Sequence, residues 1–119
     1  MRNKPSPIAC DMTAIAPEQR AQHMATIKKL FGLVEKVQEL PDGYSFKLPN
    51  DSEVVLMAAE FIALERLCCP FLDFAIDIER KGGPFWLSLI GVKPFIMAEV
   101  GDHLTASCVL KRFSGNDSI

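Results

Sequence analysis

The sequence predicts an α+β domain with the element order α-β-β-α-β-β-α. Three segments carry the start and stop signals of helices, and two pairs of apolar runs are joined by short turns that contain glycine. Two hairpins bordered by helices favour a four-stranded antiparallel sheet with the helices packed on one face.

Proline marks the start of the first and third predicted helices. Pro17 suits the first position of a helix over residues 17–31, and Gly32 can end that helix. Pro94 can open a further helix over residues 95–100. Proline costs little at these positions, because the first N–H groups of a helix have no partner within the helix.

The second predicted helix lies between capping residues and a proline. Asn50, Asp51 and Ser52 are alternative N-cap residues, and the helix continues to about Cys69. It ends there because the residue before Pro70 is pushed out of the helical conformation. The helix is apolar nearly all round, and a helix of that kind must be covered on both sides. We expect a homodimer to cover its second apolar side, which carries Leu56, Ala63 and Leu67.

Turn residues define the two predicted hairpins. Residues 34–40 and 44–48 flank a Pro-Asp-Gly run, in which proline fixes φ and glycine supplies a positive φ. Residues 71–80 and 84–90 flank a Lys-Gly-Gly run in the same way. Apolar and polar residues alternate through 71–80, which is typical of a strand with one face in solvent.

The composition bounds the organisation and the class of the protein. A chain of 119 residues, 49% hydrophobic and 24% charged, fits one domain, and we divide it into an N-terminal arm at 1–16, an α+β domain at 17–104 and a C-terminal tail at 105–119. A net charge of -2 with scattered basic residues argues against nucleic-acid binding. No signal peptide or membrane-length apolar run is apparent, so we expect a cytoplasmic protein without membrane contact.

Unusual chemistry is concentrated at the end of the second predicted helix. Cys68 and Cys69 are adjacent there, and Glu65 lies one helical turn earlier. A helical wheel places Glu65 within the apolar face, so its carboxylate is expected to point inward beside both thiols. A buried carboxylate is costly unless it is paired, hydrogen-bonded, protonated or bound to a cation. Thiolates are soft ligands, so the pattern favours zinc, copper(I) or another thiophilic metal or metalloid ion, with no organic cofactor.

The other ligands must come from elsewhere in the chain. Neighbouring side chains diverge on a regular helix, so Cys69 joins the site only if the last turn unwinds. Cys10 in the predicted arm and His23 on the first predicted helix are the available further ligands. The second choices are His103 and Cys108.

Two alternative functions remain open. In the first, the cysteines pack the core as small hydrophobes, and Arg66, Arg20 or Tyr44 satisfies Glu65; the protein is then a non-enzymatic dimeric interaction module. In the second, the protein is thiol-dependent and redox-active. Reactive thiols usually gain a low pKa from a helix N-terminus or a cation, whereas these thiols lie at a helix C-terminus beside a carboxylate. The metal interpretation therefore ranks above thiol catalysis, and an enzymatic function is disfavoured.

Several runs of the sequence form a combined pattern: C-D at 10–11, P-E-x-R-x-x-H at 17–23, L-P-D-G-Y at 40–44, E-R-x-C-C-P-F-L at 65–72 and G-G-P at 82–84. The pattern resembles a family of small bacterial proteins with no established activity, and the resemblance covers most of positions 8–100. It implies a bacterial cytoplasmic domain whose distinctive positions include Cys10, His23, Glu65, Cys68 and Cys69. The sequence thus predicts a small dimeric protein that binds a soft ion through these five residues, in metal handling or sensing.

Overall fold

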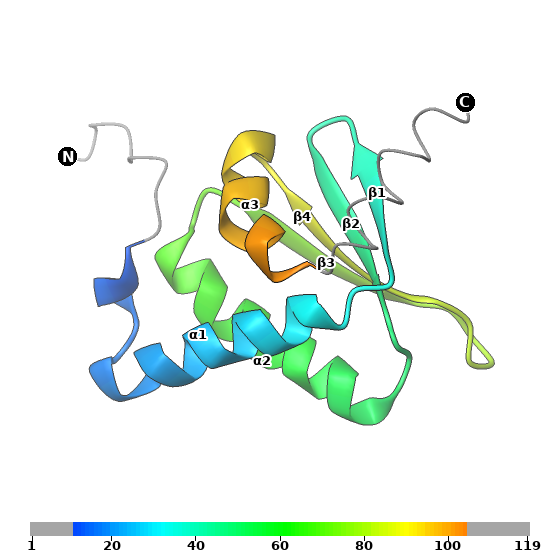
Figure 1. The fold of residues 1–119 in the computed structure, drawn as a ribbon, viewed down its shortest axis with the longest axis horizontal. Coiled ribbons are helices and arrows are strands. Elements are labelled where there is room, and N and C mark those ends of the chain that lie inside the picture. The colour runs from blue at the N-terminus through cyan, green and yellow to red at the C-terminus, as the bar shows by residue number, and fades with distance from the viewer. Residues whose placement is uncertain (1–10, 105–119) are drawn as a thin grey trace.

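The computed structural model describes residues 11–104, which form the predicted α+β fold (Figure 1). The order of helices and strands is α-β-β-α-β-β-α, as predicted, and short 3-10 helices precede the first helix and follow the last. The helices are α1 (Pro17–Gly32), α2 (Ser52–Cys68) and α3 (Lys93–Val100), with η1 (Met12–Ala14) and η2 (Gly101–His103). The strands are β1 (Lys36–Leu40), β2 (Gly43–Leu48), β3 (Asp73–Ile78) and β4 (Phe85–Ile90).

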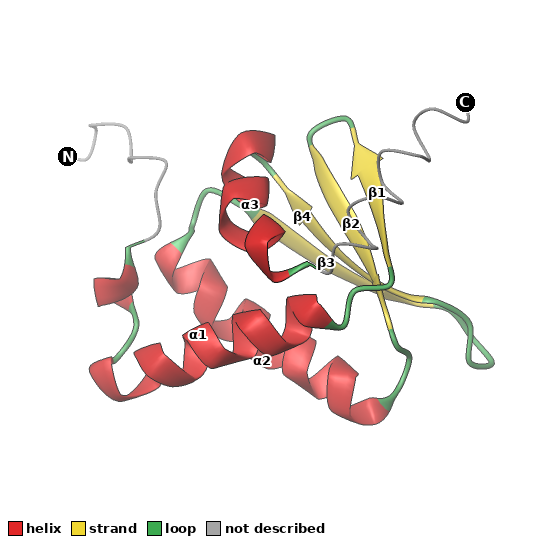
Figure 2. Ribbon diagram, in the orientation of Figure 1, coloured by secondary structure: helices red, strands yellow, loops and turns green. Residues whose placement is uncertain are grey.

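The strands form one antiparallel sheet in the order β1-β2-β4-β3 (Figure 2). The two predicted hairpins meet where β2 pairs with β4, in a register that sets Phe46 opposite Leu87. Gly43 begins β2 at a point where a Cβ atom would lie 2.2 Å from the carbonyl oxygen of Leu89, so only glycine fits. Residues alternate between buried and half-buried along β4, because the helices cover only one face of the sheet.

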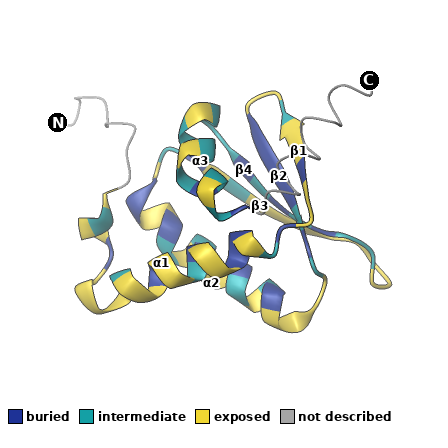
Figure 3. Cartoon of the chain, viewed as in Figure 1, coloured by how far each residue is buried: buried dark blue, intermediate teal, exposed yellow. Residues whose placement is uncertain are grey.

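The core lies between the helices and the covered face of the sheet (Figure 3). The rings of Phe31 in α1 and Phe46 in β2 meet edge to face with centroids 5.2 Å apart. Phe61 of α2 contacts Phe31 in the same way at 5.2 Å. Edge-to-face pairs are favoured because the ring edge is positive and the ring face negative. These three rings join both long helices to the sheet.

Strand β3 is more exposed than the sequence predicts, because the face expected to be buried is only partly covered. Phe74 is half-buried and contacts the Phe61 ring at a centroid distance of 6.1 Å, but Ile76 is 37% exposed and Ile78 is 46% exposed. All three lie opposite buried residues of β4, so they face the helical side of the sheet. The strand is at the edge of the sheet, and coverage is lost toward its end. The alternation therefore predicted the strand correctly but overestimated its burial.

The ends of α2 agree with the sequence signals. Asp51 is the N-cap, and its Oδ1 accepts a hydrogen bond from the backbone N–H of Val54 at 3.2 Å. On the second apolar side, Leu56 is 69% exposed and Leu67 is 41% exposed in the single chain. The homodimer that would cover them stays a prediction, as do the proposed boundaries of the arm and the tail.

Candidate metal centre

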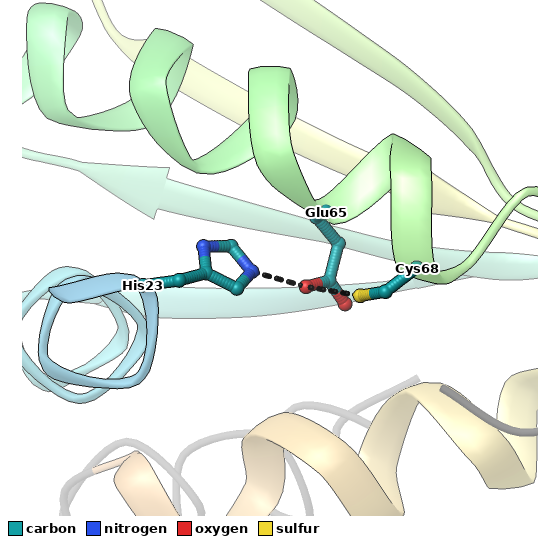
Figure 4. Close-up of side chains that lie close together, drawn as sticks. All are labelled: His23, Glu65 and Cys68. Atoms are coloured by element: carbon teal, nitrogen blue, oxygen red, sulfur yellow. Dashed lines mark hydrogen bonds and ion pairs between the residues drawn. The ribbon is translucent and has the colours of Figure 1, made fainter. Parts of the chain in front are cut away.

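Four side chains meet where the end of α2 passes between α1 and α3. His23 comes from α1, Glu65 and Cys68 come from α2, and Cys69 directly follows that helix. All four are at most 1% exposed. Figure 4 shows the Glu65 carboxylate between the His23 ring and the Cys68 sulfur. Four of the five residues predicted as ligands therefore lie together, whereas Cys10 lies outside the described residues, as does the second-choice Cys108.

His23 is placed by the buried stripe of α1. The buried residues of this helix are His23, Ile27, Leu30 and Phe31, which recur at the spacing of one helix face. The imidazole stacks on the Phe61 ring at 5.9 Å with an interplanar angle of 17°. Its Nδ1 is buried and makes no hydrogen bond with the part of the chain that the structure describes. Packing thus orients Nε2 toward α2.

The two cysteines converge because the helix ends between them. Cys69 has φ -128° and ψ 66°, which is not helical, as its position before Pro70 predicts. The two sulfur atoms lie 3.6 Å apart. This distance is far longer than the ~2.05 Å of a disulfide, so the two cysteines are not bonded to each other. The backbone N–H of Cys69 donates to the carbonyl of Glu65 at 2.8 Å, and the N–H of Asp11 donates to the carbonyl of Cys68 at 2.9 Å.

Glu65 is the centre of the polar contacts. Its Oε1 lies 2.8 Å from His23 Nε2. The thiol of Cys69 donates to Oε2 at 3.3 Å, and that of Cys68 is 3.8 Å from Oε1. Burial by itself would raise the pKa of Glu65, but hydrogen bonds from His23, Glu99 and Cys69 and the charge of His23 together hold this pKa below its ordinary value. The site therefore favours an ionised carboxylate.

Glu99 on α3 is a further member of the cluster that the sequence analysis missed. Its carboxylate is hydrogen-bonded to Glu65, and a bond between two carboxyl groups requires a shared proton. An oxygen of Glu99, one of Glu65 and the sulfur of Cys69 all lie within 4.8 Å of one another. Glu99 follows the buried Ile96 by three positions, so the helical period was a signal for its inward position.

Three other residues that the sequence suggested as partners or ligands lie outside the cluster. The Nε of Arg20 donates to the carbonyls of Met12 and Ile15, at 2.9 and 3.0 Å, and Arg66 is exposed. Arg20 thus ties the segment before α1 to the start of that helix. His103 is half-buried in η2 and belongs to neither of the candidate ligand groups.

The donor atoms suit a soft or borderline cation. One ligand group is His23, Glu65 and Cys68, whose ligand atoms lie within 4.8 Å of one another. Tetrahedral zinc with Zn–S bonds of about 2.3 Å would set two sulfurs about 3.8 Å apart, close to the observed 3.6 Å. An imidazole nitrogen and a carboxylate oxygen on one zinc would be about 3.3 Å apart. His23 and Glu65, now at 2.8 Å, would have to separate by roughly half an ångström on binding.

The chain matches no protein-family model, no curated protein and no solved structure. Within residues 11–104, no helix combines the length and the apolar character that crossing a membrane requires. The family resemblance, the bacterial origin and the cytoplasmic location therefore stay predictions.

Proposed function

We propose that this protein binds a thiophilic metal or metalloid ion through the thiolates of Cys68 and Cys69, with Glu65 and His23 as further ligands, in metal handling or sensing. The observation that carries the proposal is the convergence of both sulfurs, 3.6 Å apart, on the carboxylate of Glu65. Zinc and copper(I) are the metals that this combination of sulfur, imidazole and carboxylate ligands suits best.

The burial of the cluster favours binding over thiol catalysis. Both cysteines are 0% exposed, whereas reactive cysteines are at least partly accessible and lie near positive charge. The negative end of the α2 dipole and the Glu65 carboxylate both disfavour a thiolate without a cation. The same field attracts a cation. The thiols are therefore better suited to binding an ion than to catalysis.

Core packing alone does not explain the residue types in the cluster. Cysteines that act as small hydrophobes need no carboxylate beside them. Here a carboxylate, an imidazole and two thiols are all buried, and each buried charge requires desolvation that its partners only partly offset. Ion binding gives these residue types a function that packing does not require.

We include Cys10 in the proposal as a third thiolate. Asp11, the residue that follows Cys10, donates its backbone N–H to the carbonyl of Cys68 at 2.9 Å. Two residues separated by one peptide bond are about 3.8 Å apart at their Cα atoms. This hydrogen bond holds Asp11, the neighbour of Cys10 in the sequence, against the end of α2, and it supports Cys10 as the further ligand.

The test is the metal content of purified protein, measured by mass spectrometry after exposure to zinc or copper(I) under reducing conditions. We expect about one ion per chain in the wild type and none in the Cys68→Ser/Cys69→Ser variant. Phe46→Leu is the matched control, because it perturbs the buried core and keeps every ligand as well as the Phe61 ring that stacks on His23. We expect Cys10→Ser to weaken binding without abolishing it. Wild-type protein that stays free of metal after exposure to both ions would refute the proposal.

A further inference from the structure

We propose that the ligand is a trivalent arsenical with one organic substituent, whose arsenic binds Cys68 and Cys69 and whose substituent occupies an apolar cavity beside them. This inference rests on the proposed function and names the ligand class of the same site. Two features support it: the pair of thiols, and an apolar space that adjoins them.

The cavity has a volume of about 340 Å³ and lies among η1, α1 and α3. Its walls carry two thioethers, an aromatic ring and a methyl group, and its one ionisable side chain is Glu99. The space is a pocket open to solvent, since Met24 and Ala98 on its walls are exposed, and its volume exceeds the roughly 150 Å³ that holds benzene in an engineered protein, so an aryl substituent fits in it. The lining residues are Met12, Met24, Phe95, Ala98 and Glu99.

Glu99 connects the cavity to the thiols. It lines the cavity, yet one oxygen of its carboxylate is within 4.8 Å of both Glu65 and the Cys69 sulfur. Its side chain therefore stands at the boundary between the apolar space and the ligand cluster. A molecule with a thiophilic atom at one end and an apolar group at the other would extend across this boundary.

A bare ion would make no use of the apolar walls. Burial of apolar surface is favourable by about 25 cal/mol per Å², whereas an ion near such walls only loses hydration. Methionine side chains are flexible and polarizable, and they adapt to irregular apolar shapes. The walls therefore favour a ligand whose reactive atom carries an organic group.

The valence of arsenic matches the two thiols. In R–As=O, arsenic has one bond to carbon and a double bond to oxygen. Reaction with two thiols forms two As–S bonds and breaks the As=O bond, and the two thiol protons leave with the oxygen as water. Arsenic stays trivalent, so no oxidant or reductant is needed. The two sulfurs, 3.6 Å apart, then form the two As–S bonds, and the third bond of arsenic is to the substituent. Cys10 is therefore a ligand for a metal ion but not for this arsenical.

The test compares phenylarsine oxide with arsenite by isothermal titration calorimetry of the full chain, in a thiol-free reductant. We expect phenylarsine oxide to bind about ten- to a hundredfold more tightly, because its ring is buried in the cavity. Ala98→Phe, which fills the cavity from an exposed helix position, should reduce the affinity for phenylarsine oxide about tenfold and leave that for arsenite unchanged. Ala63→Phe is the matched control at an exposed position of α2, and it should change neither affinity.

Two results would overturn the inference: equal affinities for the two arsenicals in the wild type, or an equal loss of both in Ala98→Phe. If Ala98→Phe fails to fold, Met24→Trp fills the same cavity from another half-exposed position and decides the question. Phenylarsine oxide must also lose its binding in the Cys68→Ser/Cys69→Ser variant. Should neither arsenical bind while zinc or copper(I) still does, the inference fails and the proposed function survives; should no ion bind at all, both fail.

Discussion

The two halves of the buried stripe of α2 are equally inaccessible but chemically opposite. In the first half, Val54, Ala58 and Phe61 are at most 5% exposed and pack in the apolar core. In the second half, Glu65 and Cys68 are 0% exposed and make polar contacts. Burial therefore does not distinguish a core from a site. The distinction lies in whether the buried atoms need specific partners.

The two halves are stabilised by different forces. The first half gains from apolar burial and ring contacts, which are non-directional or only weakly directional. The second half depends on a small number of hydrogen bonds around Glu65, and each lost partner leaves a desolvated polar group. We therefore expect mutations in the first half to change stability alone, and mutations in the second half to change ion binding as well.

The largest expected effect is that of Phe61→Ala, which removes a ring in contact with Phe31 and Phe74. The free energy of unfolding should fall by about 3–5 kcal/mol, because the cavity left behind adds to the lost transfer energy. Urea denaturation measures this loss. Under conditions where the variant is folded, it should still bind one zinc ion, because every ligand remains and His23 loses only its stacked ring. A loss of metal without unfolding would contradict the separation of the two halves.

The next effect is that of Glu65→Leu in metal-free protein. This change leaves the buried Nε2 of His23 without its acceptor, and removal of one member of a buried pair costs about 3 kcal/mol. The double variant His23→Leu/Glu65→Leu removes both partners and should be more stable than Glu65→Leu alone. Denaturation of the two single variants and the double variant gives the coupling energy, which should exceed about 1 kcal/mol. Simple additivity would show that the two side chains do not act as a pair.

The smallest expected effect is that of Asp51→Ala at the start of α2. It removes the hydrogen bond from the N–H of Val54 and should lower the free energy of unfolding by about 1 kcal/mol. Asp51→Asn is the matched control, because asparagine caps helices about as well as aspartate. Metal content should be unchanged in both variants, since the cap lies at the end of the helix away from the cysteines. Impaired metal binding in Asp51→Ala would contradict this prediction.

Local sequence patterns predicted part of the candidate site. The period of the second predicted helix placed Glu65 inward, and Pro70 predicted that Cys69 would leave the helix and approach Cys68. Both features depend on residues within a few positions of one another. The inward position of His23 follows from the same helical period, because His23 recurs with Ile27 and Leu30 on one face of α1.

The sequence by itself determined the order of helices and strands, the pairing of each hairpin, the start of α2 within residues 50–52 and the inward direction of Glu65. These features follow from turn chemistry, capping and helical period, which act over short stretches of chain. Only the tertiary structure decided that His23 meets Glu65 across 42 positions, that Glu99 joins them, and that β3 is exposed at the sheet edge. Such contacts depend on how whole elements pack and on which strand lies at the edge, and no local pattern encodes either.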